Sequence, residues 1–236
     1  RSKPQLAVDI MREIREENQI RFKYVVGDSV YGQSPEFIEE IEKDSQRIYF
    51  VGVSHDTKCW TEQPITVEHT YRYGGEQKTK TIVDKTEHKP ISVGTLACNL
   101  NDYFWYRRAI GEGAKGPVVY DFARLQVVLS KNGMPDKKAW LIIRRSVDKD
   151  PKYSFFTSNA PAGIPLKTFV WLSGMRWPIE QSFEETKTEL GMDHYEVRKY
   201  PGWNHHMLTC MLGHFFLWHL KIKLGEKSTC TYSVAA

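Results

Sequence analysis

Residues 22–32, FKYVVGDSVYG, are the stretch from which the fold can be worked out. A short aromatic and β-branched run ends there at a Gly-Asp-Ser turn, which is typical of a strand that closes at Asp28. A serine before Pro35 then predicts the start of a helix, and a second buried strand is expected at residues 48–53. Apolar residues at helical spacing in residues 4–17 predict a helix before the first strand. This order of helix, strand, helix and strand predicts a parallel α/β layer with Asp28 at a strand end.

The pattern changes twice after residue 54. Helical periodicity gives way to short β-rich runs, and amphipathic helical patterns return near the C-terminal end. The predicted strands of the middle section cover residues 64–73, 78–83, 118–129, 139–144 and 153–157. The predicted helices after it cover residues 165–172, 178–190 and 203–223. We therefore expect an α/β protein with the first part of its core at residues 1–54, a β-rich insertion at 55–160 and a C-terminal helical part of the core at 161–236.

Composition is that of an ordinary globular protein. Of the 236 residues, 41% are hydrophobic and 26% are charged, which argues against a disordered, collagen-like or coiled-coil protein. The four cysteines form no C-x-x-C pair, so neither a zinc ribbon nor a disulfide scaffold is indicated and a reducing cytosol is expected. No apolar run reaches 18 residues, so no membrane span is expected. The glycine-rich G-x-x-x-x-G-K-[ST] phosphate motif of ATPases is absent from the sequence.

Positive charge is concentrated in the middle of the chain. The formal net charge is +4, but residues 56–152 contain 17 Lys and Arg against 12 Asp and Glu. Such a section suits a polyanion such as nucleic acid, and it also fits a solvated surface. Within it, residues 105–116, WYRRAIGEGAKG, favour DNA contact because bases stack on rings while Arg and Lys meet phosphates. A basic β-hairpin with a glycine loop is the alternative interpretation of this cluster.

Two further sets of residues are candidates for chemistry. Asp28 lies where open α/β sheets place groups that contact ligands, although an N-capping or turn-forming aspartate fits the same position. In residues 176–187, RWPIEQSFEETK, charged side chains spaced by four, four and three share one helical face: Arg176, Glu180, Glu184 and Lys187. Ion pairs on a helix surface would produce the same spacing.

The order and the amino-acid sequences of these segments resemble those of the DDE transposases of bacterial insertion sequences, and most closely those of the group numbered 701. The resemblance covers nearly the whole chain and is carried by residues 22–32, GEGAKGP at 111–117, the block at 176–187 and GMDHYEVR at 191–198. It implies an RNase-H-like mixed sheet with flanking helices, interrupted by the β-rich insertion. In that fold two aspartates and one glutamate hold divalent metal ions.

The resemblance also implies roles for individual residues. Asp28 corresponds to the second aspartate and Glu180 to the glutamate, while Arg176 and Lys187 occupy the basic positions of the helix signature. Ser173 stands where many relatives have a tyrosine. The implied cofactor is Mg²⁺, or Mn²⁺ as a substitute, since hard oxygen ligands and a phosphate substrate select these ions.

The implied activity is metal-dependent cleavage of DNA phosphodiesters at transposon ends, followed by strand transfer. The implied partners are transposon-end and target DNA and, in the full-length protein, a second copy of the chain. We expect DNA contacts from the insertion at Trp105, Arg107, Arg108, Lys115 and Arg124. The expected location is the bacterial cytoplasm, in association with the nucleoid.

The chain differs from the family pattern at the first of the two metal-binding aspartates. It belongs to a D-D-T-like segment well before the Asp28 block, whereas this chain begins with the helix that precedes the strand of Asp28. We therefore expect that this ligand is missing and that the chain is an N-terminally truncated form, inactive alone. The alternative is a non-catalytic remnant of a transposase that binds DNA or interferes with transposition.

Overall fold

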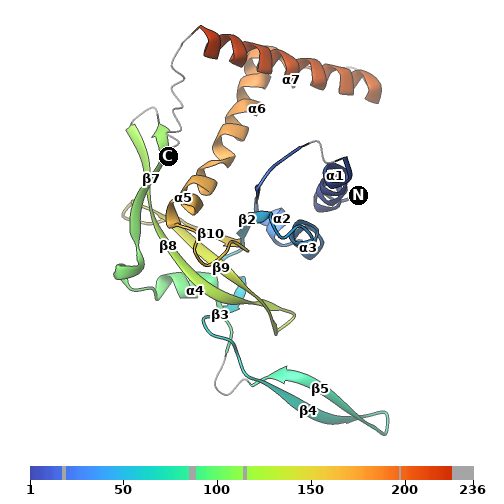
Figure 1. The fold of residues 1–236 in the computed structure, drawn as a ribbon, viewed down its shortest axis with the longest axis vertical. Helices are drawn as coiled ribbons and strands as arrows, with labels where there is room; N and C mark the ends of the chain where they lie inside the picture. Colours follow the sequence, from blue (N-terminus) through green and yellow to red (C-terminus); the bar gives the residue numbers. More distant parts are fainter. Residues whose placement is uncertain (18–19, 85–88, 114–115, 197, 225–236) are drawn as a thin grey trace. The chain divides into compact units, whose positions relative to one another are not determined.

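The chain divides into two compact units in this computed structural model, which describes residues 1–17, 20–84, 89–113, 116–196 and 198–224 (Figure 1). The first unit comprises residues 1–108 and 120–169, and the second comprises residues 109–119 and 170–236.

The first unit is built around a mixed sheet. Its strands lie in the order β1 (Tyr24–Gly27), β2 (Ile48–Val53), β10 (Tyr153–Ser158), β9 (Met134–Ser146), β8 (Gly116–Lys131), β3 (Lys58–Trp60) and β6 (Ile91–Ser92). An eighth strand, β7 (Tyr106–Gly113), pairs with β8, and residues 109–113 of β7 and 116–119 of β8 are counted with the second unit. The pair β1 and β2 is parallel, as the sequence predicts, whereas β10 runs antiparallel to both β2 and β9. The predicted mixed sheet with flanking helices is confirmed, and it is consistent with an RNase-H-like fold.

Helices α1 (Lys3–Glu17) and α3 (Pro35–Glu42) cover one side of the parallel strands. Ser34 caps α3 as expected, since its hydroxyl accepts a hydrogen bond from the backbone N–H of Phe37. Apolar side chains from both helices are buried together with those of β2: Val8, Met11, Phe37, Ile38, Ile41, Tyr49 and Val51. Each large apolar side chain that is fully buried here contributes about 1.5–3 kcal/mol.

The middle section contains a short helix, α4 (Val93–Cys98), so the expectation that helical structure is absent there is wrong. Ser92 caps it, and Val93 and Leu96 pack against Leu141 and other apolar residues of β8 and β9. With only six residues, α4 is too short to show a helical period in the sequence. The same reason explains why β3 and β6 and the four-residue helix α2 (Ser29–Gly32) were not predicted.

The predicted insertion supplies strands of two kinds. Strands β8, β9 and β10 join β2 in the large sheet, whereas β4 (Thr66–Tyr73) and β5 (Glu76–Val83) pair only with each other. Figure 1 shows these two strands as a separate hairpin. The division of the chain at residues 54 and 160 stays a prediction.

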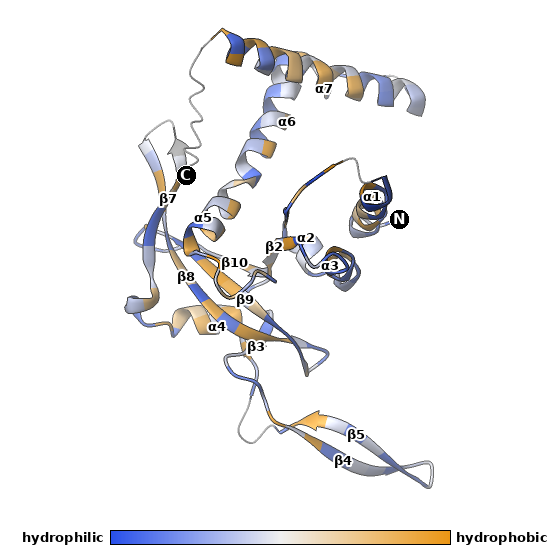
Figure 2. Ribbon diagram, viewed as in Figure 1, coloured by the Kyte–Doolittle hydropathy of each residue, from blue (hydrophilic) through white to orange (hydrophobic). Residues whose placement is uncertain are grey.

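The second unit contains α6 (Arg176–Leu190) and α7 (Tyr200–Lys223), which pack against each other. Helix α5 (Leu166–Gly174) begins in the first unit and ends in the second. Apolar residues occur along the whole length of α7 in Figure 2, and many of them are exposed. Among the described residues, no helix combines the length and the apolar character needed to cross a membrane.

Two glycines bring α2 into backbone contact with β2. A Cβ atom at Gly32 would overlap the carbonyl oxygen of Gly52, and a Cβ atom at Gly52 would lie 3.0 Å from the amide nitrogen of Ser29. Both positions therefore require glycine for steric reasons. The contact fixes the turn that carries Asp28 directly against the neighbouring strand.

We predict that Gly32→Ala destabilises the protein by about 1–3 kcal/mol, the usual cost of overpacking, because the backbone of β2 has to move. Chemical denaturation measures this change. Gly163→Ala is the matched control, since a Cβ atom there meets nothing within 4 Å. A Gly32→Ala protein as stable as the Gly163→Ala protein would contradict the close contact.

A buried carboxylate joins α1 to α3. The side chain of Glu40 is 2% exposed and forms ion pairs with Arg12 at 3.2 Å, with Lys43 at 2.8 Å and with Arg15. Burial alone would raise the pKa of Glu40, but hydrogen bonds from Lys43 and Arg12 and the charge of Arg15 outweigh it and lower the pKa. Glu40 therefore stabilises the folded protein in its ionised form.

We predict that Glu40→Gln lowers the free energy of unfolding by about 1.5–3 kcal/mol at pH 7, the range for hydrogen bonds to charged groups. Because the pKa is lowered on folding, the contribution of Glu40 is present above the ordinary glutamate pKa and disappears as the pH falls below about 4. Denaturation at pH 7 and pH 3 should show a difference between the two proteins that shrinks in acid. A difference that is independent of pH would count against this role.

Candidate active site

Asp28 lies at the carboxyl end of β1, as the sequence predicts. Its Oδ1 accepts a hydrogen bond of 2.9 Å from the backbone N–H of Val30, so it caps α2, and its side chain is half-buried. The N-capping role that the sequence left open is therefore observed. A carboxylate has two oxygens and about four acceptor sites, so one hydrogen bond leaves it able to bind a cation as well.

Glu180 lies on the exposed face of α6. Its Oε1 accepts a hydrogen bond of 2.7 Å from Arg176, and the two side chains are 62% and 46% exposed. Helix α6 begins at Arg176, so the four charged residues of the predicted face share one helix, and all four are exposed. Exposed ion pairs of this kind contribute about 0–1 kcal/mol, so the Arg176 contact leaves Glu180 free to exchange partners.

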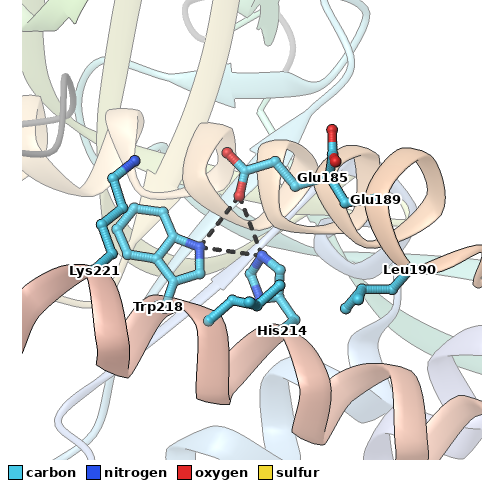
Figure 3. A pocket seen from close by; sticks show the side chains of 7 residues that line it. Glu185, Glu189, Leu190, His214, Trp218 and Lys221 are labelled. Carbon is cyan, nitrogen blue, oxygen red and sulfur yellow. Dashed lines mark hydrogen bonds and ion pairs between the residues drawn. The ribbon is translucent and has the colours of Figure 1, made fainter.

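Unlike the exposed Glu180, Glu185 lies on the side of α6 that faces α7 (Figure 3). One oxygen accepts hydrogen bonds of 3.2 Å from Trp218 and 3.2 Å from His214, and the other accepts one of 2.7 Å from Gln181. Burial would raise the pKa of Glu185, but hydrogen bonds from His214, Gln181 and Trp218 outweigh it and lower the pKa. This cluster connects α6 to α7.

The Glu185 cluster was not predicted from the sequence. His214 and Trp218 are four residues apart, which places them on one helical face, but nothing in the sequence pairs that face with Glu185. The cluster lines a hollow between the two helices that also includes Glu189, Leu190, Leu217 and Lys221.

The predicted DNA-contact residues lie in different environments. Residues 106–113 and 116–131 form strands β7 and β8, as the β-hairpin interpretation expected. Arg107 is 62% exposed and donates from Nε to Asp121 at 2.9 Å, and this hydrogen bond is the main reason for the lowered pKa of Asp121. Arg108 is exposed and donates to the carbonyl oxygen of Arg107. Lys115 lies outside the described residues.

Trp105 and Arg124 take part in packing within the first unit. The ring of Trp105 lies 4.0 Å from the guanidinium of Arg145 and packs against the core of the sheet. Arg124 donates to the carbonyl oxygen of Ile164 at 2.5 Å and lies over the ring of Trp140. Contact with DNA stays a prediction for every residue of this set.

The carboxylates predicted to bind metal belong to separate units, Asp28 to the first and Glu180 to the second. Their oxygens are the hard donors that Mg²⁺ and Mn²⁺ prefer, so the donor chemistry fits these ions. Within the part of the chain that the structure describes, no group of three or more His, Cys, Asp and Glu side chains is arranged to hold a metal ion.

Comparison with known proteins identifies the family. No curated protein matches the chain. A family model described as a transposase DDE domain matches residues 1–216, which include both Asp28 and Glu180. That match extends over far more than half of the sequence, and the fold agrees with it. The chain belongs to the family of transposases with a DDE domain.

Proposed function

We propose that this protein is the transposase of a bacterial insertion sequence of the group numbered 701, and that Asp28 and Glu180 bind its catalytic metal ions. The observation that carries the proposal is the family match over residues 1–216, which includes a carboxylate at the end of β1 and another on the exposed face of α6. Both side chains have acceptor capacity beyond the single hydrogen bonds described above.

The reaction consists of two phosphoryl transfers. Water attacks a phosphodiester at the transposon end and the bond to the 3′ oxygen breaks, which leaves a 3′ hydroxyl and a 5′ phosphate. The 3′ hydroxyl then attacks a phosphodiester of the target, and a target 3′ oxygen leaves. Bound Mg²⁺ or Mn²⁺ would supply activation of the attacking oxygen and stabilisation of the leaving oxygen.

Asp28 and Glu180 would hold these ions through carboxylate oxygens. Bound cations would offset the negative charge of these carboxylates. The exposed Arg176 compensates the charge of Glu180 in the free protein. Lys187, exposed on the same helix, is available for the phosphates of DNA.

DNA binding is proposed to use the basic residues of the middle section and of α6. The first set comprises Trp105, Arg107, Arg108, Lys115 and Arg124, and of its described members Arg107 and Arg108 are exposed. Arg176 and Lys187 form the second set. We further propose that the protein acts as a homodimer on paired ends and associates with the nucleoid.

We predict that Glu180→Gln lowers cleavage of transposon-end DNA by at least about 100-fold, more than is usual when a residue merely orients a metal ligand. The substitution keeps the shape of the side chain and removes the charge that binds the ion. The measurement is cleavage of a supercoiled plasmid carrying the element's ends by the full-length transposase, in Mg²⁺ and in Mn²⁺.

Glu184→Gln is the matched control, because Glu184 lies one turn further along the same exposed face. This variant should cleave normally, and its stability should change by less than about 1 kcal/mol. Normal cleavage by Glu180→Gln together with loss in Glu184→Gln would show that the position of the ligand is wrong. If the unsubstituted protein binds the ends and cleaves in neither metal, the non-catalytic alternative holds.

A further inference from the structure

The hairpin formed by β4 and β5, residues 66–83, is exposed on both of its faces. The strands pair in register from Thr66 opposite Val83 to Tyr73 opposite Glu76, and they form a sheet of their own. Every side chain of β4 is exposed, as are those of β5 up to Thr81. At its base Val83 packs with Trp60 and Val128, which anchors the hairpin to the rest of the unit. We call this hairpin the ribbon.

One face of the ribbon combines rings and cations. Residues paired across the strands share a face, which places His69 and Tyr71 beside Lys78 and Lys80. The ammonium of Lys80 lies 5.5 Å from the ring centre of Tyr71, and that of Lys78 lies 5.2 Å from the ring centre of Tyr73. The ring of His69 stacks on that of Tyr71.

The other face of the ribbon is rich in hydroxyl groups. The hydroxyls of Thr70 and Thr79 lie 3.3 Å apart, and Thr66, Thr81 and Arg72 are on the same face. At the tip, Gly74 and Gly75 have φ angles of 63° and 85°, which suit the tight turns that keep a hairpin twisted in the right-handed sense. The ribbon thus presents hydrogen-bonding groups on both sides.

This geometry is unusual for an element whose role is structural. An isolated two-stranded hairpin is marginally stable in water, and stable sheets normally bury one face. The ribbon buries neither face and adds little to the core, so its side chains remain available to a partner. A flat protein surface would cover one face and leave the other in water, whereas a groove contacts both.

We propose that the ribbon lies in the major groove of duplex DNA, an inference that rests on the proposed transposase function. The major groove is about 12 Å wide and admits a two-stranded ribbon. In this position the hydroxyl-rich face with Thr70 and Thr79 lies toward the base edges, and Lys78 and Lys80 on the opposite face extend to phosphates at the groove wall. The ribbon is a contact separate from the residues proposed at positions 105–124.

The test compares two double variants with the same change in net charge. Lys78→Gln/Lys80→Gln alters the ribbon, and Lys149→Gln/Lys152→Gln alters exposed residues of the turn between β9 and β10. Fluorescence anisotropy gives the affinity of the full-length protein for transposon-end duplex as a function of salt concentration. The ribbon variant should bind at least about tenfold more weakly at 0.1 M salt, and its negative slope of log K against log salt should be shallower by about 1.8.

Protection of guanine N7 from dimethyl sulfate reports on the major groove. The unsubstituted protein and the Lys149→Gln/Lys152→Gln variant should protect the same guanines, and the ribbon variant should lose part of this protection. Equal affinities and slopes for the two variants, or unchanged N7 protection, would overturn the placement of the ribbon and leave the proposed function intact. Failure of the unsubstituted protein to bind end DNA would instead overturn the proposed function, and this inference with it.

Discussion

The backbone contact between Gly32 and Gly52 is the constraint on which the position of Asp28 depends. With no side chain between them, α2 rests on β2 at the point where the parallel strands end. Asp28 then both closes β1 and caps α2, and its carboxylate is held at the edge of the sheet. A larger residue at either glycine would lift this turn from the sheet and move the carboxylate with it.

Helix α6 presents two kinds of carboxylate, and their environments suggest different roles. Glu185 is satisfied by three donors, and those hydrogen bonds tie α6 to α7. Glu180 is exposed and shares a single ion pair with Arg176. Glu180 has acceptor sites left for a cation beside its one ion pair, whereas both oxygens of Glu185 already accept hydrogen bonds. Of these two carboxylates, Glu180 is therefore the one that we propose as a metal ligand.

Helices and strands with a long or distinctive residue pattern could be predicted from the sequence. Strand β2, helix α3 with its Ser34 cap and the start of β1 were predicted within a few residues, because buried β-branched runs and capping residues are local signals. The short helix α4 and strand β3 were missed, since six and three residues are too few for a period. The antiparallel pairing of β10 with β2 was also missed, because it joins residues about one hundred positions apart.

In the candidate site, too, residues marked by a local sequence pattern were predicted, and contacts made by tertiary packing were not. Asp28 and Glu180 follow from a strand end and a helix signature, both of which are local. The partners of Glu185 on α7 and the pairing of Arg107 with Asp121 depend on tertiary packing, which no local pattern contains. Trp105 illustrates the difference, because its aromatic and basic neighbours suggested DNA contact while its ring packs against the core.

The central claim is that Asp28 and Glu180 share bound divalent metal, and metal-directed cleavage of the chain tests it directly. Fe²⁺ substituted for Mg²⁺ generates hydroxyl radicals with ascorbate and peroxide, and these cut the backbone next to the ion. With transposon-end DNA bound, we predict cuts beside both Asp28 and Glu180 that excess Mg²⁺ suppresses and that Asp28→Asn abolishes at both places. Cuts beside only one of the two residues, or cuts that Mg²⁺ leaves unchanged, would contradict the claim.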